Sequence, residues 1–291
     1  NLPDALGFVA GLDASKPDIN AVVENGKKAF AGYELAGHTL GVVGLGRIGC
    51  LVAEAAIRLG MQVVGYDPEI TVDAAWSLPA QVRKAHSLQE VLKASHMVSL
   101  HVPLVEATRR LIDGAALEQM RHTAVLLNFS REGVVDAEAV ATALEGNKLG
   151  RYVCDFPAKA IHGHPKVIAL PHLGASTREA EENCAVMVAD QIRDYLENGT
   201  VRNSVNFPEA VVPRESGYRV AIANANVPNM LSQISTAMAD GRLNIHNMLN
   251  KSLGDMAYTI VDTDSAVPKR VIKAIGSIEG VLAVRYLPAP T

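Results

Sequence analysis

The run G-L-G-R-I-G at residues 44–49 has the glycine spacing of a dinucleotide-binding turn. In such a turn Gly44 permits a tight bend, Gly46 lets the backbone approach a pyrophosphate, and Gly49 lets a helix pack closely on a strand. The run follows the apolar stretch Thr39–Val43 and opens a helical stretch, whose first N–H groups are free to bind phosphate. The spacing therefore predicts a nucleotide site more strongly than a purely structural turn.

Asp67 gives this site a preference between cofactors. It ends the second apolar run, 18 residues after Gly49, where a carboxylate accepts hydrogen bonds from the ribose hydroxyls. The carboxylate would repel a 2′-phosphate, and no arginine follows at positions 68–70. The sequence therefore predicts NAD rather than NADP.

Two further segments carry residues suited to acid–base and anion chemistry. Arg131 follows an apolar run, and an arginine there can hold a carboxylate through two parallel hydrogen bonds, although a surface arginine in a local ion pair fits equally well. His172 follows the last such run and is a natural proton donor to a carbonyl. By itself, a histidine hydrogen-bonded at a helix start is the commoner case.

The elements that would position these residues alternate between apolar runs and amphipathic stretches. Runs that are apolar throughout are typical of strands buried on both faces of a parallel sheet. Helices are expected at 48–59, at Leu88–Ala94 with a capping box from Ser87 and Glu90, and at Ala137–Glu145 capped by Asp136. Together these elements predict an α/β fold with a doubly wound parallel sheet of the Rossmann type. Its strands are expected at 39–43, 61–66, 97–101, 124–128, 151–156 and 167–170.

The C-terminal third has a different order of helices and strands. A long helix is expected at Thr177–Glu197, ending at Asn198-Gly199, and residues 201–214 form a linker. Residues 217–287 then follow the order strand, helix, strand, strand, helix, strand. This order predicts a ferredoxin-like βαββαβ unit.

Composition excludes several classes of function. Among 291 residues 48% are hydrophobic and 20% charged, and the net charge of −4 provides no basic field for nucleic acid or an anionic membrane. No apolar run approaches the ~20 residues that span a bilayer, and no signal peptide is visible, so we expect a cytoplasmic protein. The three cysteines fit free thiols, and His162 and His164 lack converging acidic or cysteine ligands, so no metal is expected.

Five segments together resemble the D-isomer-specific 2-hydroxyacid dehydrogenases. They are GVVGLGRIG, SLHVPL, LLNFSREGVVD, YVCDFP and ALPHLGAST, and they occur in the family's order and spacing. The C-terminal unit resembles an ACT domain, and the resemblance extends over about residues 1–287. It implies NAD-dependent oxidation of 3-phosphoglycerate to 3-phosphohydroxypyruvate, the first step of L-serine synthesis. A dehydrogenase for another 2-hydroxy acid, or an NAD-sensing regulator without catalysis, remains an alternative.

The resemblance also implies roles for individual residues. Arg131 would bind the substrate carboxylate and polarise the keto oxygen, and His172 would be the acid–base group. The residues expected around the cofactor are Gly44, Gly46, Arg47, Ile48, Gly49, Asp67, His101, Val102, Pro103, Phe129, Ser130, Arg131, Asp155, His172, Leu173, Gly174 and Ala175. In the ACT-like unit, Asn224, Asn226 and Asn244 are candidate contacts for an L-serine effector, although exposed turn asparagines are equally consistent.

The sequence departs from the family pattern at several positions. The family usually places a glutamate, paired with the catalytic histidine, a few residues after the position of Asp155, and residues 156–166 hold no carboxylate. Phe129 stands where a small residue is usual, and Asn229 stands where the family has glycine after proline.

Four segments are expected. Residues 1–36 would be a remnant of the substrate lobe with hinge helices, 37–176 the NAD-binding domain, 177–214 a returning helix and linker, and 215–291 the ACT-like domain. We therefore expect these 291 residues to bind NAD but to turn over phosphoglycerate poorly. The resemblance also suggests a homo-oligomer, a dimer or a tetramer.

Overall fold

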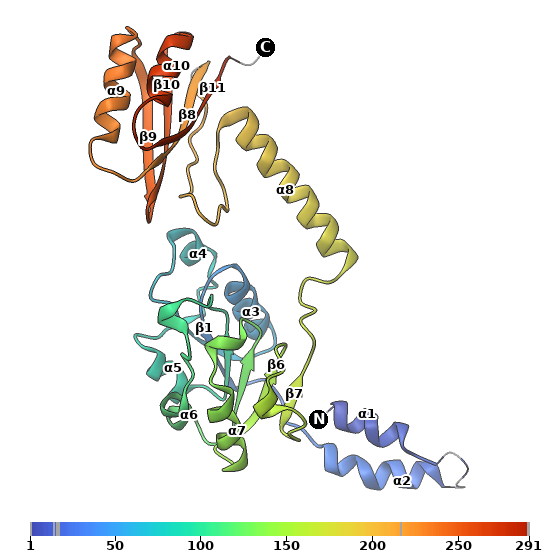
Figure 1. Ribbon diagram of the computed structural model, residues 1–291. Coiled ribbons are helices and arrows are strands. Elements are labelled where there is room, and N and C mark those ends of the chain that lie inside the picture. The colour runs from blue at the N-terminus through green and yellow to red at the C-terminus, as the bar shows by residue number, and fades with distance from the viewer. Residues whose placement is uncertain (1, 14, 16–17, 216, 290–291) are drawn as a thin grey trace. The chain divides into compact units, whose positions relative to one another are not determined.

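The computed structural model describes residues 2–13, 15, 18–215 and 217–289. The chain divides into two compact units, Asn1–Gly174 and Ala175–Thr291 (Figure 1). The four segments expected from the sequence are finer than this division, and their boundaries stay a prediction.

The first unit is built on a seven-stranded sheet of order β3-β2-β1-β4-β5-β6-β7, in which every strand pair is parallel. This order confirms the predicted doubly wound sheet, with β1 and β5 at the predicted bounds. β3 was not predicted. The strands are β1 (Thr39–Val43), β2 (Gln62–Tyr66), β3 (Arg83–Lys84), β4 (Met97–Leu100), β5 (Ala124–Asn128), β6 (Leu149–Cys154) and β7 (Val167–Ala169).

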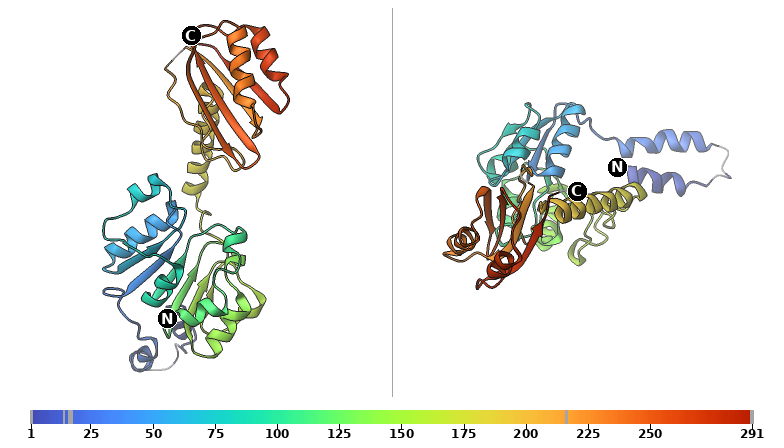
Figure 2. Two further views of the ribbon diagram at one scale, coloured as in Figure 1. Left: turned by 90° about the vertical axis from the view of Figure 1, so that its left-hand side faces the viewer. Right: turned by 90° about the horizontal axis from the view of Figure 1, so that it is seen from above.

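Helices cover both faces of this sheet (Figure 2). Alternate side chains of β1 belong to different clusters, because successive residues of a strand point to opposite faces. Val42 packs with Ala53 and Ala56 of one helix, whereas Val43 belongs to a larger cluster with Leu92, Leu117 and Leu144. The helices are α3 (Arg47–Arg58), α4 (Val72–Ser77), α5 (Leu88–Ala94), α6 (Gly114–Gln119) and α7 (Ala137–Glu145).

The helix caps follow the sequence with one correction. Asp136 caps α7 by accepting hydrogen bonds from the N–H groups of Glu138 and Ala139. Ser87 likewise accepts a bond from the N–H of Glu90. The Glu90 carboxylate does not return to Ser87, because it accepts instead from the His86 N–H and pairs with Arg83. The predicted reciprocal capping box is therefore wrong, and only its serine half forms.

The N-terminal segment contributes α1 (Leu2–Ala10), α2 (Ile19–Gly26) and a 3₁₀ turn at Lys27–Phe30. The Phe8 ring packs against Gly26, where a Cβ atom would overlap it, and lies 5.4 Å from the Phe30 ring. The side chains of Leu2 and Leu6 are more than two-thirds exposed. The described part of residues 1–36 contains the helices that the sequence predicts, and no strand.

The second unit contains a four-stranded antiparallel sheet of order β11-β8-β10-β9. One face packs on α9 and α10, and the other packs on residues 201–212 through Phe207 and Ala210. This confirms the predicted βαββαβ unit. Its elements are α8 (Arg178–Asn198), β8 (Tyr218–Ala225), α9 (Met230–Asp240), β9 (Ile245–Leu253), β10 (Met256–Thr263), α10 (Lys269–Gly276) and β11 (Val281–Leu287).

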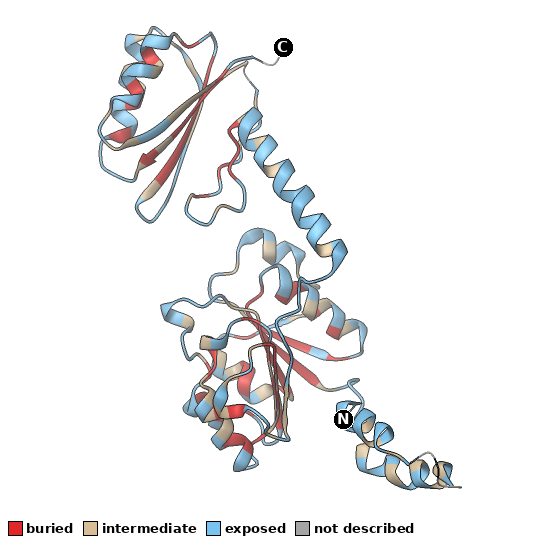
Figure 3. Cartoon of the chain, turned by 45° about the vertical axis from the view of Figure 1, so that its right-hand side comes forward, coloured by how far each residue is buried: buried red, intermediate tan, exposed pale blue. Residues whose placement is uncertain are grey.

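Helix α8 has no buried residue, yet its C-terminus is firmly attached to the sheet of its own unit (Figure 3). A helix leaves its last four carbonyls without partners inside the helix. Here Arg285 donates to the carbonyls of Tyr195 and Leu196, while Arg214 and Arg219 donate to those of Glu197 and Asn198. Gly199 then ends the helix in the left-handed conformation with a φ of 71°.

None of the helices in the described ranges is both long and apolar enough to cross a lipid bilayer.

Candidate active site

The first unit gathers nearly all the expected cofactor residues at one edge of its sheet. Gly44 follows β1, Asp67 follows β2 and His101 follows β4. Arg131 lies three residues after β5, Asp155 follows β6, and His172 lies three residues after β7. Because all seven strands are parallel, these positions share the carboxyl edge, where ligands bind in such folds. Ala175 is the exception, since it belongs to the second unit.

The glycine turn has the geometry that its spacing predicts. Gly44 has a φ of +90°, and Gly49 lies so close that its Cβ would be 2.0 Å from the Gly44 carbonyl oxygen. A Cβ at Gly46 would meet nothing within 4 Å. Helix α3 begins at Arg47, and its N-cap residue Gly46 provides no side-chain cap for the N–H groups of the first turn. The turn fits a pyrophosphate.

Asp67 is fixed beside the turn by the backbone. Its Oδ2 accepts a hydrogen bond from the Leu45 N–H at 2.8 Å, and its Oδ1 accepts one from the Glu69 N–H at 2.9 Å. A carboxylate oxygen can accept two hydrogen bonds, so both oxygens retain capacity for ribose hydroxyls.

We expect Asp67→Ala to reduce the preference for NAD over NADP by roughly tenfold or more. The variant loses charge-assisted bonds to the ribose, each worth about 1.5–3 kcal/mol, and the repulsion of a 2′-phosphate. Fluorescence titration of both reduced cofactors measures the ratio. Glu69→Ala removes the same charge two residues away and should leave the ratio unchanged. Equal affinity of the unaltered chain for both cofactors would contradict this prediction.

His101 lies at the end of β4 on the side expected for adenine. Its N–H donates to the Val43 carbonyl at 2.7 Å, and its Nε2 lies 2.8 Å from the Ser99 hydroxyl. Burial lowers the pKa of His101 to about 4, so the ring is neutral at pH 7. Val102 and Pro103, also expected on the adenine side, follow His101 directly, and the Val102 side chain lies close to Gly44.

The lowered pKa of His101 makes stability depend on pH. The unfolded chain binds this proton below about pH 6.5 and the folded chain only near pH 4. Stability is therefore fully present above pH 6.5 and is lost as the pH falls towards 4, by at most about 3 kcal/mol for a shift of this size. Urea unfolding at several pH values should show a shallower loss for His101→Gln than for the unaltered chain. Parallel curves would refute the assignment.

The loop carrying Arg131 is organised by Asn128, a residue whose role no sequence motif indicated. Asn128 is fully buried. Its Oδ1 accepts bonds from the Ser130 N–H and hydroxyl, and its Nδ2 donates to the Arg131 carbonyl and to the Tyr152 hydroxyl. Arg131 Nη1 donates to the Ser130 carbonyl at 2.7 Å. The network fixes the backbone at Phe129–Arg131.

Asp155 provides a second test of the fit to NAD. Its side chain is buried, yet Oδ1 has no hydrogen-bond partner in the described part of the chain. A buried acceptor without a donor costs free energy unless a ligand supplies one. A nicotinamide carboxamide carries such donor N–H groups, so this site suits the nicotinamide end of the cofactor.

Phe156 contacts His172 and lines the same groove as Arg131. The His172 ring is exposed and lies 4.6 Å from the Phe156 ring, between centroids. Phe156 also lines a groove of about 900 Å³ with Arg131, Leu104 and Arg110. Within the described residues, no carboxylate forms an ion pair with His172, so the absence of the family's glutamate from the sequence is not compensated in this unit.

The candidate effector residues are only partly brought together in the second unit. A cavity of about 240 Å³ is lined by Asn224, Asn226 and Asn250, with Asn229 in the left-handed conformation at the start of α9. Buried Asn224 accepts from the Thr259 hydroxyl, to which Asn250 donates. Asn250 was not foreseen.

Asn244 lies elsewhere and donates to Asp264. Asn224 pairs with Ala257 of β10, whereas the strand after Asn244 begins opposite Thr263, roughly 20 Å further along at ~3.4 Å per residue. One copy of the chain therefore does not place Asn244 in this cavity.

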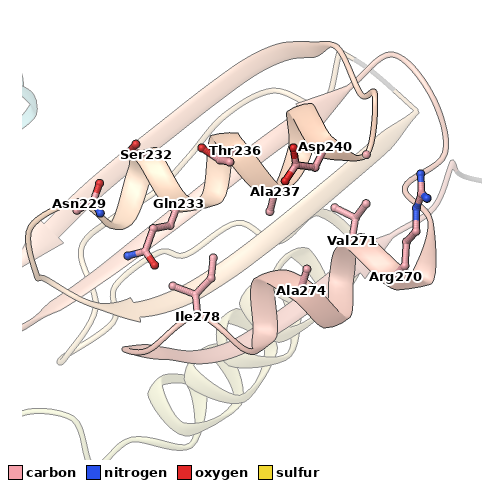
Figure 4. Close-up of a pocket in the computed structure, with 11 residues that line it drawn as sticks. Asn229, Ser232, Gln233, Thr236, Ala237, Asp240, Arg270, Val271, Ala274 and Ile278 are labelled. Carbon is pink, nitrogen blue, oxygen red and sulfur yellow. The ribbon is translucent and has the colours of Figure 1, made fainter.

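A separate groove of about 620 Å³ lies between α9 and α10 (Figure 4). Its floor holds the small or apolar residues Ala237, Val271 and Ala274, and one end holds Asp240 and Arg270. Among the described residues, neither charged side chain has an ion-pair partner. This groove lies outside the NAD site.

No group of three or more histidine, cysteine or acidic side chains within the described ranges is placed to hold a metal ion.

Comparison with known proteins identifies this architecture. Residues 9–174 match the D-isomer specific 2-hydroxyacid dehydrogenase, NAD binding domain. The chain is similar to "D-3-phosphoglycerate dehydrogenase" of Haemophilus influenzae, with 32% identity over 97% of this chain and 71% of that protein.

Two solved structures share the fold. A glyoxylate reductase from Paecilomyes thermophila matches with 27% identity and a TM-score of 0.56, covering 64% of this chain and 57% of that one. A D-isomer specific 2-hydroxyacid dehydrogenase from Lactobacillus delbrueckii ssp. bulgaricus, in an NAD-complexed form, matches with 25% identity and a TM-score of 0.53, covering 61% and 58%. The chain thus spans less than two thirds of either solved chain.

The chain belongs to the D-isomer specific 2-hydroxyacid dehydrogenase family, and its first unit is the family's NAD-binding domain.

Proposed function

We propose that the protein oxidises 3-phosphoglycerate to 3-phosphohydroxypyruvate with NAD. The observation that carries this proposal is the similarity over both units to a protein called D-3-phosphoglycerate dehydrogenase. The two solved structures described above match only 61–64% of the chain. A βαββαβ unit joined to an NAD domain suits a biosynthetic enzyme with a regulatory module.

The side chains at the carboxyl edge have different roles in this reaction. Bound NAD would supply the hydride acceptor for C2 of the hydroxy acid. Arg131 holds the substrate carboxylate in the groove beside Phe156, and His172 takes the hydroxyl proton on an imidazole nitrogen. Asp155 Oδ1, buried without a donor in the described part of the chain, would accept a hydrogen bond from the carboxamide and orient the nicotinamide ring. The Asn128 network holds the Arg131 backbone in place.

The substrate is tested by following NADH formation with the complete gene product. We expect 3-phosphoglycerate to give a higher kcat/KM than D-lactate, D-glycerate or 2-hydroxyglutarate. A higher value for any of the others would assign the protein to a different substrate within the same family.

A second candidate is an NAD-sensing regulator without catalysis. It is favoured by the surroundings of His172, whose described contact is the Phe156 ring rather than a carboxylate. This candidate predicts NAD binding without turnover of any 2-hydroxy acid. Measurable NADH formation that disappears in a His172 variant would exclude it.

We also propose that L-serine binds the amide-lined cavity of the ACT-like unit. The lining residues carry no charged side chain. The side-chain amides of Asn224 and Asn226 are fixed by donating to the carbonyls of Ala225 and Gly254. Asn244 would join the site from a second copy, which requires a homo-oligomer.

Calorimetry on an oligomeric sample tests the effector. We expect heat on adding L-serine, and a loss of affinity of roughly tenfold in Asn226→Ala, since one hydrogen bond to a charged group contributes about 1.5 kcal/mol or more. Asn247→Ala removes an amide outside the cavity and should bind serine normally. An absence of heat with the unaltered protein would end the regulatory proposal without affecting the assignment of the NAD domain.

A further inference from the structure

The first N–H of β1 is held by a histidine ring rather than by a carbonyl. The Thr39 N–H donates to Nδ1 of His96 at 3.0 Å, and the His96 N–H donates to the Thr39 carbonyl at 2.9 Å. Thr39 is 8% exposed, so little water is available to replace the ring nitrogen. This reciprocal pair extends the ladder between β1 and β4 by one step at the edge opposite the NAD site.

Such a bond requires an unprotonated Nδ1. A neutral imidazole accepts at one nitrogen and donates at the other, whereas an imidazolium donates at both. A proton on Nδ1 therefore replaces an acceptor by a donor that faces the Thr39 N–H. The bond is lost, and the buried N–H is left without a partner, which is more costly than never having formed it.

The surroundings of His96 are cationic or neutral. The ring of His38 meets it edge-on, with 4.7 Å between centroids, and Tyr33 lies 5.2 Å beyond His38. Burial lowers the pKa of His96, and the charges of Arg121 and His38 lower it further. Within the described ranges no carboxylate forms an ion pair with either histidine. His38 Nδ1 is itself buried and has no hydrogen-bond partner among the residues that the structure describes.

Loss of this bond would affect the segment that leads into the NAD-binding turn. Residues 31–38 join the N-terminal helices to β1, and β1 runs directly into the Gly44 turn. Besides the Thr39–His96 pair, two backbone bonds hold the junction: the Gln62 N–H donates to the His38 carbonyl, and the Gly37 N–H donates to the Gly60 carbonyl.

We propose that the His96–Thr39 bond is a proton-sensitive latch that holds the start of β1 at neutral pH and opens in mild acid. The direction of the pH dependence follows from the acceptor role of His96 Nδ1. The latch is closed above about pH 6.5, the ordinary range of histidine, and opens as the pH falls through the lowered value for His96.

Amide hydrogen exchange in the full chain, followed by NMR, tests the latch. The readout is the protection of the Thr39 amide relative to that of Val42, which is fully buried in the middle of the same strand. The ratio cancels any global loss of stability, including that caused by His101. Between about pH 7.5 and about pH 5 we expect the ratio to fall about tenfold, the size of one net hydrogen bond.

Two variants make the test specific. His96→Asn places an amide oxygen where Nδ1 stands and cannot titrate, so the ratio should stay high at both pH values. His38→Gln removes a neighbouring positive charge, which should move the opening to higher pH. A pH-independent ratio in the unaltered chain, or the same pH dependence in His96→Asn, would overturn the proposal.

Discussion

Removing the carboxylate of Asp262 should lower the free energy of unfolding of the second unit by about 3–5 kcal/mol. Asp262 and Arg219 are 1% and 0% exposed and face each other across β8 and β10. Nε of Arg219 donates to Oδ1 at 2.6 Å and Nη2 donates to Oδ2 at 2.8 Å. The other donors of Arg219 bind the carbonyls of Asn198, Val212 and Pro213. In Asp262→Ala this buried guanidinium has no countercharge.

The experiment is denaturant unfolding with controls of two kinds. Asp190→Ala breaks the Asp190–Arg193 pair, which is 2.9 Å long but more than half exposed, and should cost at most about 1 kcal/mol. The double variant Arg219→Met/Asp262→Leu removes both charges and should recover much of the loss, because a buried ion pair adds little over apolar packing. A single Asp262→Ala variant as stable as Asp190→Ala would show that water reaches Arg219.

The strands of the first unit could be predicted because a parallel sheet buries both faces of each strand. β1 and β5 accordingly appear in the sequence as continuous apolar runs at their observed bounds. β3 has only the two residues Arg83 and Lys84, both exposed, and carries no such pattern. Helices α4 and α6 have six residues each, too few for a recognisable amphipathic period.

The candidate site could be predicted where it depends on strand order, and not where it depends on register. Residues that follow parallel strands share one edge, so Gly44, Asp67 and His172 follow from the topology. The link from Asn250 through Thr259 to Asn224 requires residue 250 to lie opposite residue 259, which the alternation of side chains does not determine. The same register places Asn244 at the far end of the sheet.

The largest kinetic effect is expected at His172. In the complete gene product, His172→Gln should lower kcat with 3-phosphoglycerate by about 10²–10⁴-fold, the usual contribution of a positioned acid–base group. Glutamine keeps a hydrogen-bonding side chain but cannot carry the proton. NADH affinity should change little, because the Gly44–Gly49 turn, Asp67 and Asp155 are unaltered.

His162→Gln is the matched control, since His162 is an exposed histidine of the same unit, outside the carboxyl edge of the sheet. It should retain full activity, which separates loss of a proton carrier from general damage to the domain. Stopped-flow measurement of NADH formation and fluorescence titration of NADH together provide the two readouts. Retained turnover in His172→Gln with normal NADH binding would show that a group other than His172 transfers the proton. Loss of NADH binding would mean instead that His172 acts through the cofactor pocket, where its ring packs against Phe156.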